Sequence, residues 1–279
     1  MRFVIADGKI VEKDQYKVPE IFFNNGIHLC QKIWYGYGGI PLFAENMNLF
    51  KRQAEVLKIK LPAEYENQRE LFRLIKRMLN KNRFYRSGQI VLQIFAGERS
   101  VHTLVSSIAY VTFTFPIGED GVLAAFSSQK KYTLNSMNQW PFYSEKFWQA
   151  ALAENKETSV QQVIVLNEND SVCECAYGSF FVIAGNELLT PSLQSGCHEN
   201  ALRELISEAA AKLGLKTTEA GFISRDQIFE ADELFCASEA KGIQWVMGIE
   251  KQRFIHYYSA KITEELNVLL KRKAGSNPL

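Results

Sequence analysis

The sequence lacks the features that mark secreted, membrane-spanning or zinc-binding chains. No apolar run approaches the roughly 20 residues that span a bilayer. The first residues also lack the basic segment followed by an apolar one that marks a signal peptide. The five cysteines are scattered and form no C-x-x-C pair, so we expect reduced thiols and no zinc. These absences predict a soluble, cytoplasmic protein without bound metal.

An excess of charge of either sign is also missing. The 32 basic and 31 acidic residues leave a formal net charge of +1. Such a balance gives no general attraction to nucleic acid or to an anionic membrane, and we expect neither as a partner. The motifs H-E-x-x-H, G-x-S-x-G and the P-loop are absent as well. The sequence therefore points to no zinc protease, serine hydrolase or P-loop nucleotide-binding protein.

The length and the order of the apolar patterns indicate two domains. The chain has 279 residues and is 47% hydrophobic, which suffices for two ordinary cores. Strand and helix patterns are mixed without a regular βαβ alternation, which favours the α+β class. We expect a smaller N-terminal domain over 1–116, a linker over 117–121 and a larger C-terminal domain over 122–279.

Apolar periodicity and turn residues predict the individual elements. We expect a hairpin about Asp7-Gly8 and a loop followed by a strand over 19–35. Helices are expected over 45–58, 67–83, 145–155, 199–213 and 259–273, and strands over 89–95, 107–115, 122–127, 160–166 and 171–183. The aromatic run over 140–148 is interpreted as core or dimer interface, because no basic stripe accompanies it.

Three segments of the second half carry a family resemblance. They are an apolar strand and turn leading to Glu174 and 178–183, the segment 189–203 with Thr190-Pro191 and Arg203, and the segment 230–246 with Ala231-Asp232-Glu233. In order and spacing they resemble class IV pyridoxal-phosphate enzymes. This group includes branched-chain and D-amino-acid aminotransferases and aminodeoxychorismate lyase. The first half is similar more loosely, through Asn25-Gly26, 41–43 and the helix over 46–59.

This resemblance implies a fold and an activity. The fold is the two-domain D-amino-acid aminotransferase-like architecture, fold-type IV, as a homodimer. The cofactor is pyridoxal 5′-phosphate, and the substrate is an amino acid or an amino-chorismate, processed by a transaminase or a lyase.

The chemistry of that cofactor requires a lysine that forms a Schiff base and a carboxylate near the ring nitrogen. Glu174 stands where the family keeps its glutamate. For the lysine, Lys146 is the nearest candidate, 28 positions before Glu174, although the family's spacing is longer. Lys130 and Lys131 qualify only if an insertion follows them. His198, in the loop before Arg203, is the histidine that could line a cleft.

A cup of backbone N–H groups and a cation must also hold the phosphate. The resemblance assigns this role to the amides of Ala201 and Leu202, to Arg203 and to a later contact at Ser238.

Several of the family's phosphate-site residues are replaced in this sequence. The changed positions are Asn46 and Leu49 in its H-x-x-R pair and Asn200 and Leu202 in its G-I-T-R turn. Two hypotheses remain. The chain is a class IV enzyme with an eroded cofactor site, or it is a non-catalytic homologue that keeps the fold to bind another small anion or a protein partner.

Overall fold

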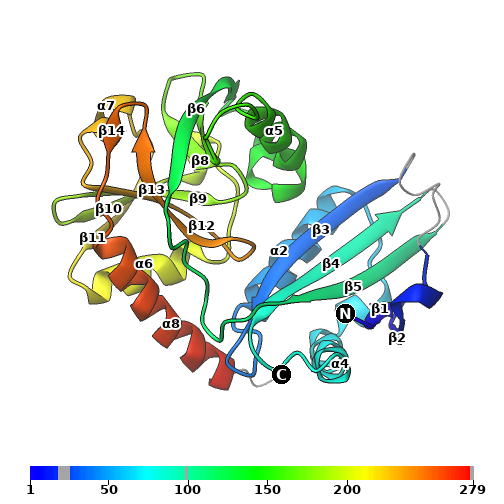
Figure 1. The fold of residues 1–279 in the computed structure, drawn as a ribbon. Coiled ribbons are helices and arrows are strands. Elements are labelled where there is room, and N and C mark those ends of the chain that lie inside the picture. The colour runs from blue at the N-terminus through cyan, green and yellow to red at the C-terminus, as the bar shows by residue number, and fades with distance from the viewer. Residues whose placement is uncertain (18–25, 98–99, 277–279) are drawn as a thin grey trace. The chain divides into compact units, whose positions relative to one another are not determined.

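Figure 1 presents the fold as a computed structural model, which describes residues 1–17, 26–97 and 100–276. The chain divides into two compact units. One unit comprises Met1–Phe115 and the residues from Leu270 onward, and the other comprises Pro116–Leu269. The expected linker over 117–121 thus belongs to the second unit. The described residues from Leu270 to Ser276, which the sequence analysis assigned to the second domain, belong to the first unit.

The first unit is built on an antiparallel sheet with the order β2-β1-β5-β4-β3. Its strands are β1 (Phe3–Ala6), β2 (Lys9–Glu12), β3 (Ile27–Tyr35), β4 (Gly88–Ala96) and β5 (Val101–Ala109). The expected hairpin joins β1 to β2, where Asp7 and Gly8 adopt φ of 46° and 75°. The strand part of the 19–35 expectation is β3, while residues 18–25 lie outside the described residues.

One strand expectation in this unit was wrong. The sequence suggested a strand over 107–115, but β4 pairs with the nine residues Val101–Ala109, beginning at the Ala96–Val101 pair. The short connection after Ala96 fixes that register, so the apolar residues beyond Ala109 fall past the end of the ladder.

Three helices accompany this sheet. They are α2 (Phe43–Val56), α3 (Ala63–Glu66) and α4 (Gln68–Lys81). The buried residues of α4 recur at steps of three and four, at Leu71, Ile75, Met78 and Leu79, as an amphipathic helix requires. The Asn67 side chain accepts the Glu70 N–H and caps the start of α4.

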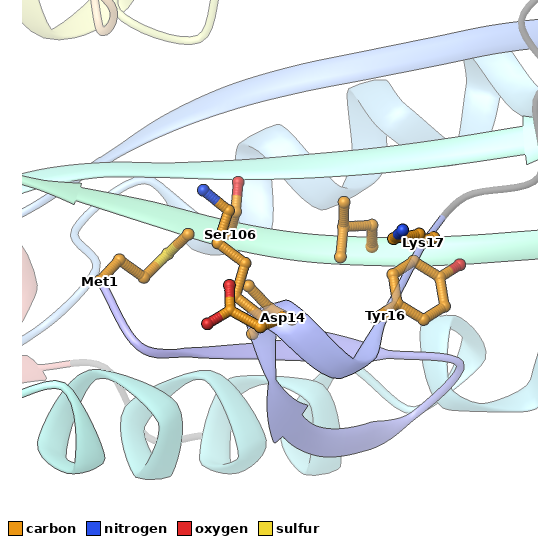
Figure 2. Close-up of a pocket in the computed structure, with 8 residues that line it drawn as sticks. Met1, Asp14, Tyr16, Lys17 and Ser106 are labelled. Atoms are coloured by element: carbon orange, nitrogen blue, oxygen red, sulfur yellow. The ribbon is translucent and has the colours of Figure 1, made fainter.

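The first unit also contains a pocket of about 560 Å³ (Figure 2). It lies where the start of the chain meets β5, and Lys13, Asp14 and Lys17 contribute its charges. None of the site residues expected from the sequence is among the described residues that line it. Lys17 lines this pocket and is followed by residues 18–25, which lie outside the described residues. We therefore assign this pocket no function.

The second unit is built on a nine-stranded mixed sheet with the order β11-β10-β9-β12-β13-β6-β7-β8, with β14 pairing to β13. Its strands are β6 (Val122–Lys131), β7 (Gln162–Asn167), β8 (Val172–Cys175), β9 (Ser179–Ala184), β10 (Glu187–Pro191), β11 (Lys216–Ala220), β12 (Glu233–Ser238), β13 (Gly242–Ile249) and β14 (Gln252–Arg253).

Helices α5 (Pro141–Ala153), α6 (Arg203–Lys212), α7 (Arg225–Phe229) and α8 (Tyr258–Ser276) complete the second unit, with the end of α8 reaching the first. Short 3-10 turns η2 (Ser136–Gln139) and η3 (Leu193–Ser195) precede α5 and α6. Together the two units confirm the α+β class. Within the described part of the chain, no helix is both long enough and apolar enough to cross a membrane.

The core of the second unit explains why β7 is central. All six residues of β7 are buried, because it pairs in parallel with β6 on one side and antiparallel with β8 on the other. Apolar side chains from this sheet, including Ile164, Leu166, Phe180 and Val246, form one buried cluster. This cluster holds β6 and β8 at fixed positions on either side of β7.

Candidate functional site

A buried lysine and a buried glutamate meet across β7. Lys131 is the last residue of β6, and Glu174 is the third residue of β8. Their strands are two ladder spacings apart, roughly 10 Å, which two long side chains can bridge. The Lys131 Nζ atom lies 2.6 Å from Glu174 Oε1. The two side chains are only 3% and 0% exposed, so this ion pair is sealed from solvent.

Glu174 accepts four contacts from the chain. Its Oε1 atom accepts from Lys131 and from the Trp148 indole N–H at 2.6 Å. Its Oε2 atom accepts the His198 backbone N–H at 2.8 Å and lies 2.7 Å from His198 Nδ1. An ionised carboxylate offers about four acceptor positions. The acceptor capacity of Glu174 is therefore filled by its own chain.

Lys131 is saturated in the same way. An ammonium group carries three N–H donors. Besides Glu174, Lys131 Nζ donates to Ser144 Oγ at 2.8 Å and to the Gly196 carbonyl at 3.3 Å. Burial raises the pKa of Glu174, but the positive charge of Lys131 and the contacts with His198 outweigh it and lower that pKa to about 2. The carboxylate is thus ionised at neutral pH.

Helix α5 brings two of these side chains to the cluster (Figure 1). Pro141 occupies the first turn, where its missing N–H costs nothing and its fixed φ suits a helix. Ser144 and Trp148 are four residues apart, so they share one face of the helix, and both are buried. That face packs toward β6 and β7, which places Ser144 at Lys131 and Trp148 at Glu174.

The lysine expected from the sequence is not at the site. Lys146 is exposed on α5, between the inward-facing Ser144 and Trp148. The lysine beside Glu174 is Lys131, 43 positions before it. Two features hid it: β6 continues through polar residues beyond the expected end at Ser127, and η2 with α5 lengthens the connection. A usable signal was Asn135, which caps η2 four residues after Lys131, because the family's lysine precedes an Asn-containing helix start.

Two of the expected phosphate residues, Leu202 and Ser238, come close together, and each has a hydrogen-bond partner within the chain. The Leu202 N–H, at the start of α6, donates to the Asn200 side-chain oxygen at 2.9 Å. The Asn200 Nδ2 donates to the Ala237 carbonyl at 3.1 Å, which brings this loop against the end of β12. There the Ser238 Oγ accepts the Lys241 N–H at 3.2 Å. Among the expected residues, the loop before Leu202 and the end of β12 with Ser238 thus lie side by side.

The guanidinium group of Arg203 holds the loop before α6. It donates to the Pro191 carbonyl at 2.6 Å, to Cys197 Sγ at 3.0 Å and to Glu219 at 3.2 Å. Cys197 directly precedes His198, so Arg203 and Glu174 hold the same loop from two sides. The side chain of Arg203 acts here as a loop anchor and does not point at Glu174.

The thiols beside the cluster are poor nucleophiles. Burial raises the pKa of Cys173 and that of Cys197, the second against the opposing effect of Arg203. Both therefore remain protonated at neutral pH. No group of three or more His, Cys, Asp or Glu side chains in the described ranges is arranged to hold a metal ion.

Comparisons with known proteins bear on this arrangement. The family model described as amino-transferase class IV matches residues 34–249, which include Lys131, Glu174, His198 and Arg203. The chain belongs to the class IV aminotransferase family. Among curated relatives, a probable branched-chain-amino-acid aminotransferase of Thermotoga maritima is 29% identical over 115 residues. That match covers 41% of this chain and 42% of the relative, so it spans less than half of either.

Solved structures share the fold of this class IV member over nearly its whole length. The branched-chain aminotransferase of Thermoproteus uzoniensis has a TM-score of 0.85 at 21% identity, with 97% of this chain and 95% of that chain covered. The branched-chain amino acid aminotransferase of Thermobaculum terrenum, in its PLP-bound holo-form, has a TM-score of 0.83 at 15% identity, with 98% and 94% covered. These likenesses establish the fold-type IV architecture.

Proposed function

We propose that this chain is a non-catalytic class IV homologue, which keeps the fold without pyridoxal phosphate and acts by binding a protein partner. The observation that carries the proposal is the saturation of the buried Lys131–Glu174 pair. A cofactor-dependent homologue would need both groups available to the cofactor. Here the chain uses them on each other and on its own side chains.

The donor types fit the cofactor, but their arrangement does not. In a pyridoxal ring the nitrogen and the carbon bearing the aldehyde stand at opposite ends. A carboxylate at the nitrogen and an amine at the aldehyde are therefore separated by the ring. The direct contact of 2.6 Å between Lys131 and Glu174 leaves no space between them, so a ring could enter only if the two side chains separated. A ring nitrogen would also have to displace Trp148 or His198 from the carboxylate.

The phosphate end argues in the same direction. The Leu202 N–H is bonded within the loop, and the Arg203 guanidinium holds Pro191, Cys197 and Glu219. Losing a charge-assisted contact weakens binding by about 1.5–3 kcal/mol. Since these same groups would have to hold any other small anion, we favour a protein partner over an anion.

A surface of the first unit supports the choice of a protein partner. Four large apolar side chains are exposed around the start of β4 and the end of β5, namely Tyr85 at 66%, Ile108 at 54%, Val111 at 81% and Phe113 at 60%. Backbone bonds of Ser87 to Tyr110 and Thr112 hold the two segments together. Exposed apolar groups gathered in one place favour association, and we propose a second copy of this chain as the partner.

The cofactor part of the proposal is tested by incubating the protein with pyridoxal 5′-phosphate, reducing it with borohydride and mapping modified lysines by mass spectrometry. We expect no visible band after dialysis and no stoichiometric label at Lys131. Surface lysines are labelled only in proportion to the reagent concentration. A titration with the reagent therefore separates this surface labelling from a stoichiometric label at Lys131. A single label per chain that disappears in Lys131→Ala would overturn the proposal.

The partner part is tested by sedimentation of Val111→Asp/Phe113→Asp. We expect a dimer for the unaltered chain and a monomer for this variant. Val268→Asp, which places one such negative charge at an exposed valine of α8, is the control and should remain dimeric. A monomeric unaltered chain would contradict the assignment of the partner.

The retained Lys131 favours one second candidate, a class IV transaminase or lyase acting on an amino acid or amino-chorismate. In that case Lys131, and not Lys146, would form the Schiff base, and its side chain would have to leave Glu174 and Ser144. The labelling experiment distinguishes the candidates, because the enzyme predicts a label that survives Lys146→Ala and is lost in Lys131→Ala.

A further inference from the structure

We propose that Trp148 and Asn200 are built-in substitutes for the ring and the phosphate of the family's cofactor, and that removing them opens a site for a phosphorylated aromatic ring. The proposal rests on the proposed function, in that the unaltered chain carries no cofactor. It goes further by naming the two side chains that keep the cofactor out and the ligand class that the altered protein would take.

Trp148 supplies what a protonated pyridine ring would supply. Its indole is planar and aromatic, and its N–H donates to Glu174 Oε1 at 2.6 Å. The indole contacts the rings of His198 and Tyr177, with centroids 4.8 Å and 5.0 Å away. Lys131 Nζ lies 5.9 Å from its ring centre. An aromatic N–H on the carboxylate is the contact that a protonated pyridine nitrogen would make with Glu174.

Asn200 supplies what a phosphate oxygen would supply. Its Oδ1 atom accepts the Leu202 N–H at 2.9 Å, at the start of α6, where an anion would accept the same hydrogen. Its Nδ2 atom spans to the Ala237 carbonyl at 3.1 Å and closes the gap between the loop and β12. The resemblance places the family's first glycine of the G-I-T-R turn at this position, and a glycine has no side chain to span that gap.

Trp148 and Asn200 are connected through the loop that precedes α6. The loop between them contributes His198 to Glu174 and Gly196 to Lys131. Trp148 and His198 are each 4% exposed, so the ring end has no access for a ligand while the indole is in place. An ordinary core tryptophan would leave only a less stable protein when truncated. A substitute for a ligand leaves a protein that binds that ligand.

The experiment compares the unaltered chain, Trp148→Ala, Asn200→Gly and the double variant by isothermal titration calorimetry. The probe is pyridoxine 5′-phosphate, which lacks the aldehyde, so binding does not require a covalent bond to Lys131. We expect no measurable binding of the probe to the unaltered chain. The double variant should bind the probe at least tenfold more tightly than the weakest binding that the measurement detects. The affinity for unphosphorylated pyridoxine should rise in Trp148→Ala, but adding Asn200→Gly should not raise it further.

The matched control is Trp245→Ala. Its indole also donates a hydrogen bond, to the Gly118 carbonyl at 3.0 Å, and stacks on His256 instead of contacting Glu174. This variant should not bind the probe. A folded double variant that binds no better than the unaltered chain or Trp245→Ala overturns the inference while the proposed function stands. Binding of the probe by the unaltered chain, together with a Lys131 label in the separate experiment with pyridoxal 5′-phosphate and borohydride, overturns the proposed function instead.

Trp148→Leu covers the case in which the alanine variant does not fold, because leucine retains apolar volume and removes the N–H donor. The affinity of Trp148→Leu for the probe should exceed that of the unaltered chain at least threefold. An unchanged affinity overturns the inference. If neither variant folds alone, both are refolded with and without the probe. A ligand that binds only the folded state raises the folded fraction. Recovery with the probe supports the inference, and equal recovery without it overturns the inference.

Discussion

Two carboxylates of the second unit are completely buried, and they are satisfied in opposite ways. Glu233, on β12, accepts the backbone N–H groups of Tyr257, Tyr258 and Ser259 and the Ser259 hydroxyl, at 2.6–2.9 Å. Those donors are consecutive residues at the start of α8. Glu174 instead accepts from Lys131, Trp148 and His198, which come from three separate segments.

The difference separates a carboxylate that caps a helix from a carboxylate in a buried ion pair. Free N–H groups at a helix start attract a carboxylate wherever one is near, so Glu233 needs no cation. Glu174 is neutralised by a buried lysine, which carries its own desolvation cost and which stability alone does not require. A buried ion pair of this kind marks Glu174 and Lys131 as candidates for a functional role. The following predictions test that comparison.

Replacing the cation should have the largest effect. Lys131→Met leaves Glu174 buried with only the His198 and Trp148 contacts. Removing one partner of a buried pair costs about 3–5 kcal/mol of the free energy of unfolding. Urea unfolding measures it. Lys130→Met is the matched control, because Lys130 pairs with Asp170 in an exposed bridge at 2.9 Å and should cost less than about 1 kcal/mol. Equal effects at both lysines would abolish the distinction.

Acid should weaken the Glu174 cluster next. The pKa of Glu174 in the folded protein is about 2, below the ordinary value of 4.5. The stabilisation is complete above the unfolded value and is lost as the pH falls through the folded one. Over that window the loss is about 3 kcal/mol. Urea titrations at a series of pH values should give a shallower acid dependence for Glu174→Gln. An identical pH dependence of the free energy of unfolding in both proteins would show that Lys131 does not lower the pKa of Glu174.

Neutralising the cap should cost less than removing Lys131. Glu233→Gln keeps the size of the side chain and one acceptor oxygen, but loses the charge and two of the bonds at the start of α8. A typical hydrogen bond contributes about 1 kcal/mol net, so losing two predicts a loss of about 2 kcal/mol of the free energy of unfolding. Hydrogen exchange should show the first turn of α8 opening selectively. A loss as large as that of Lys131→Met would equate the two carboxylates.

The smallest effect is expected at Ser144. Ser144→Ala removes one acceptor of Lys131, at 2.8 Å, while Glu174 and Gly196 remain. A single hydrogen bond to a charged group in a cluster that can adjust should cost about 1 kcal/mol. In a double-mutant cycle with Lys131→Met the two effects should not add, because the serine bond is lost with the lysine. Strict additivity would mean that Ser144 does not act through Lys131.

Much of the fold could be predicted, because it depends on local patterns. Helix α4 and strand β7 follow directly from apolar periodicity, and the Asp7-Gly8 turn follows from backbone preference. The family pieces around Glu174 and Arg203 were also legible, because they are continuous segments with fixed spacing. Sequence reasoning missed the role of Trp148, which it interpreted only as core or interface. An indole N–H has the same sequence signature whether it meets a carboxylate or a carbonyl.

The amino-acid order alone determined the family, the α+β class and the place of the carboxylate, since each is carried by residues close together in the chain. Only the tertiary structure decided which lysine meets Glu174 and whether either group is left available. Which lysine meets Glu174 depends on β6 and β8, which flank β7 in the sheet, and on α5, which follows β6 in the chain. Distance along the chain says nothing about which side chains fill a buried space, and here the protein's own Trp148, His198 and Lys131 fill it.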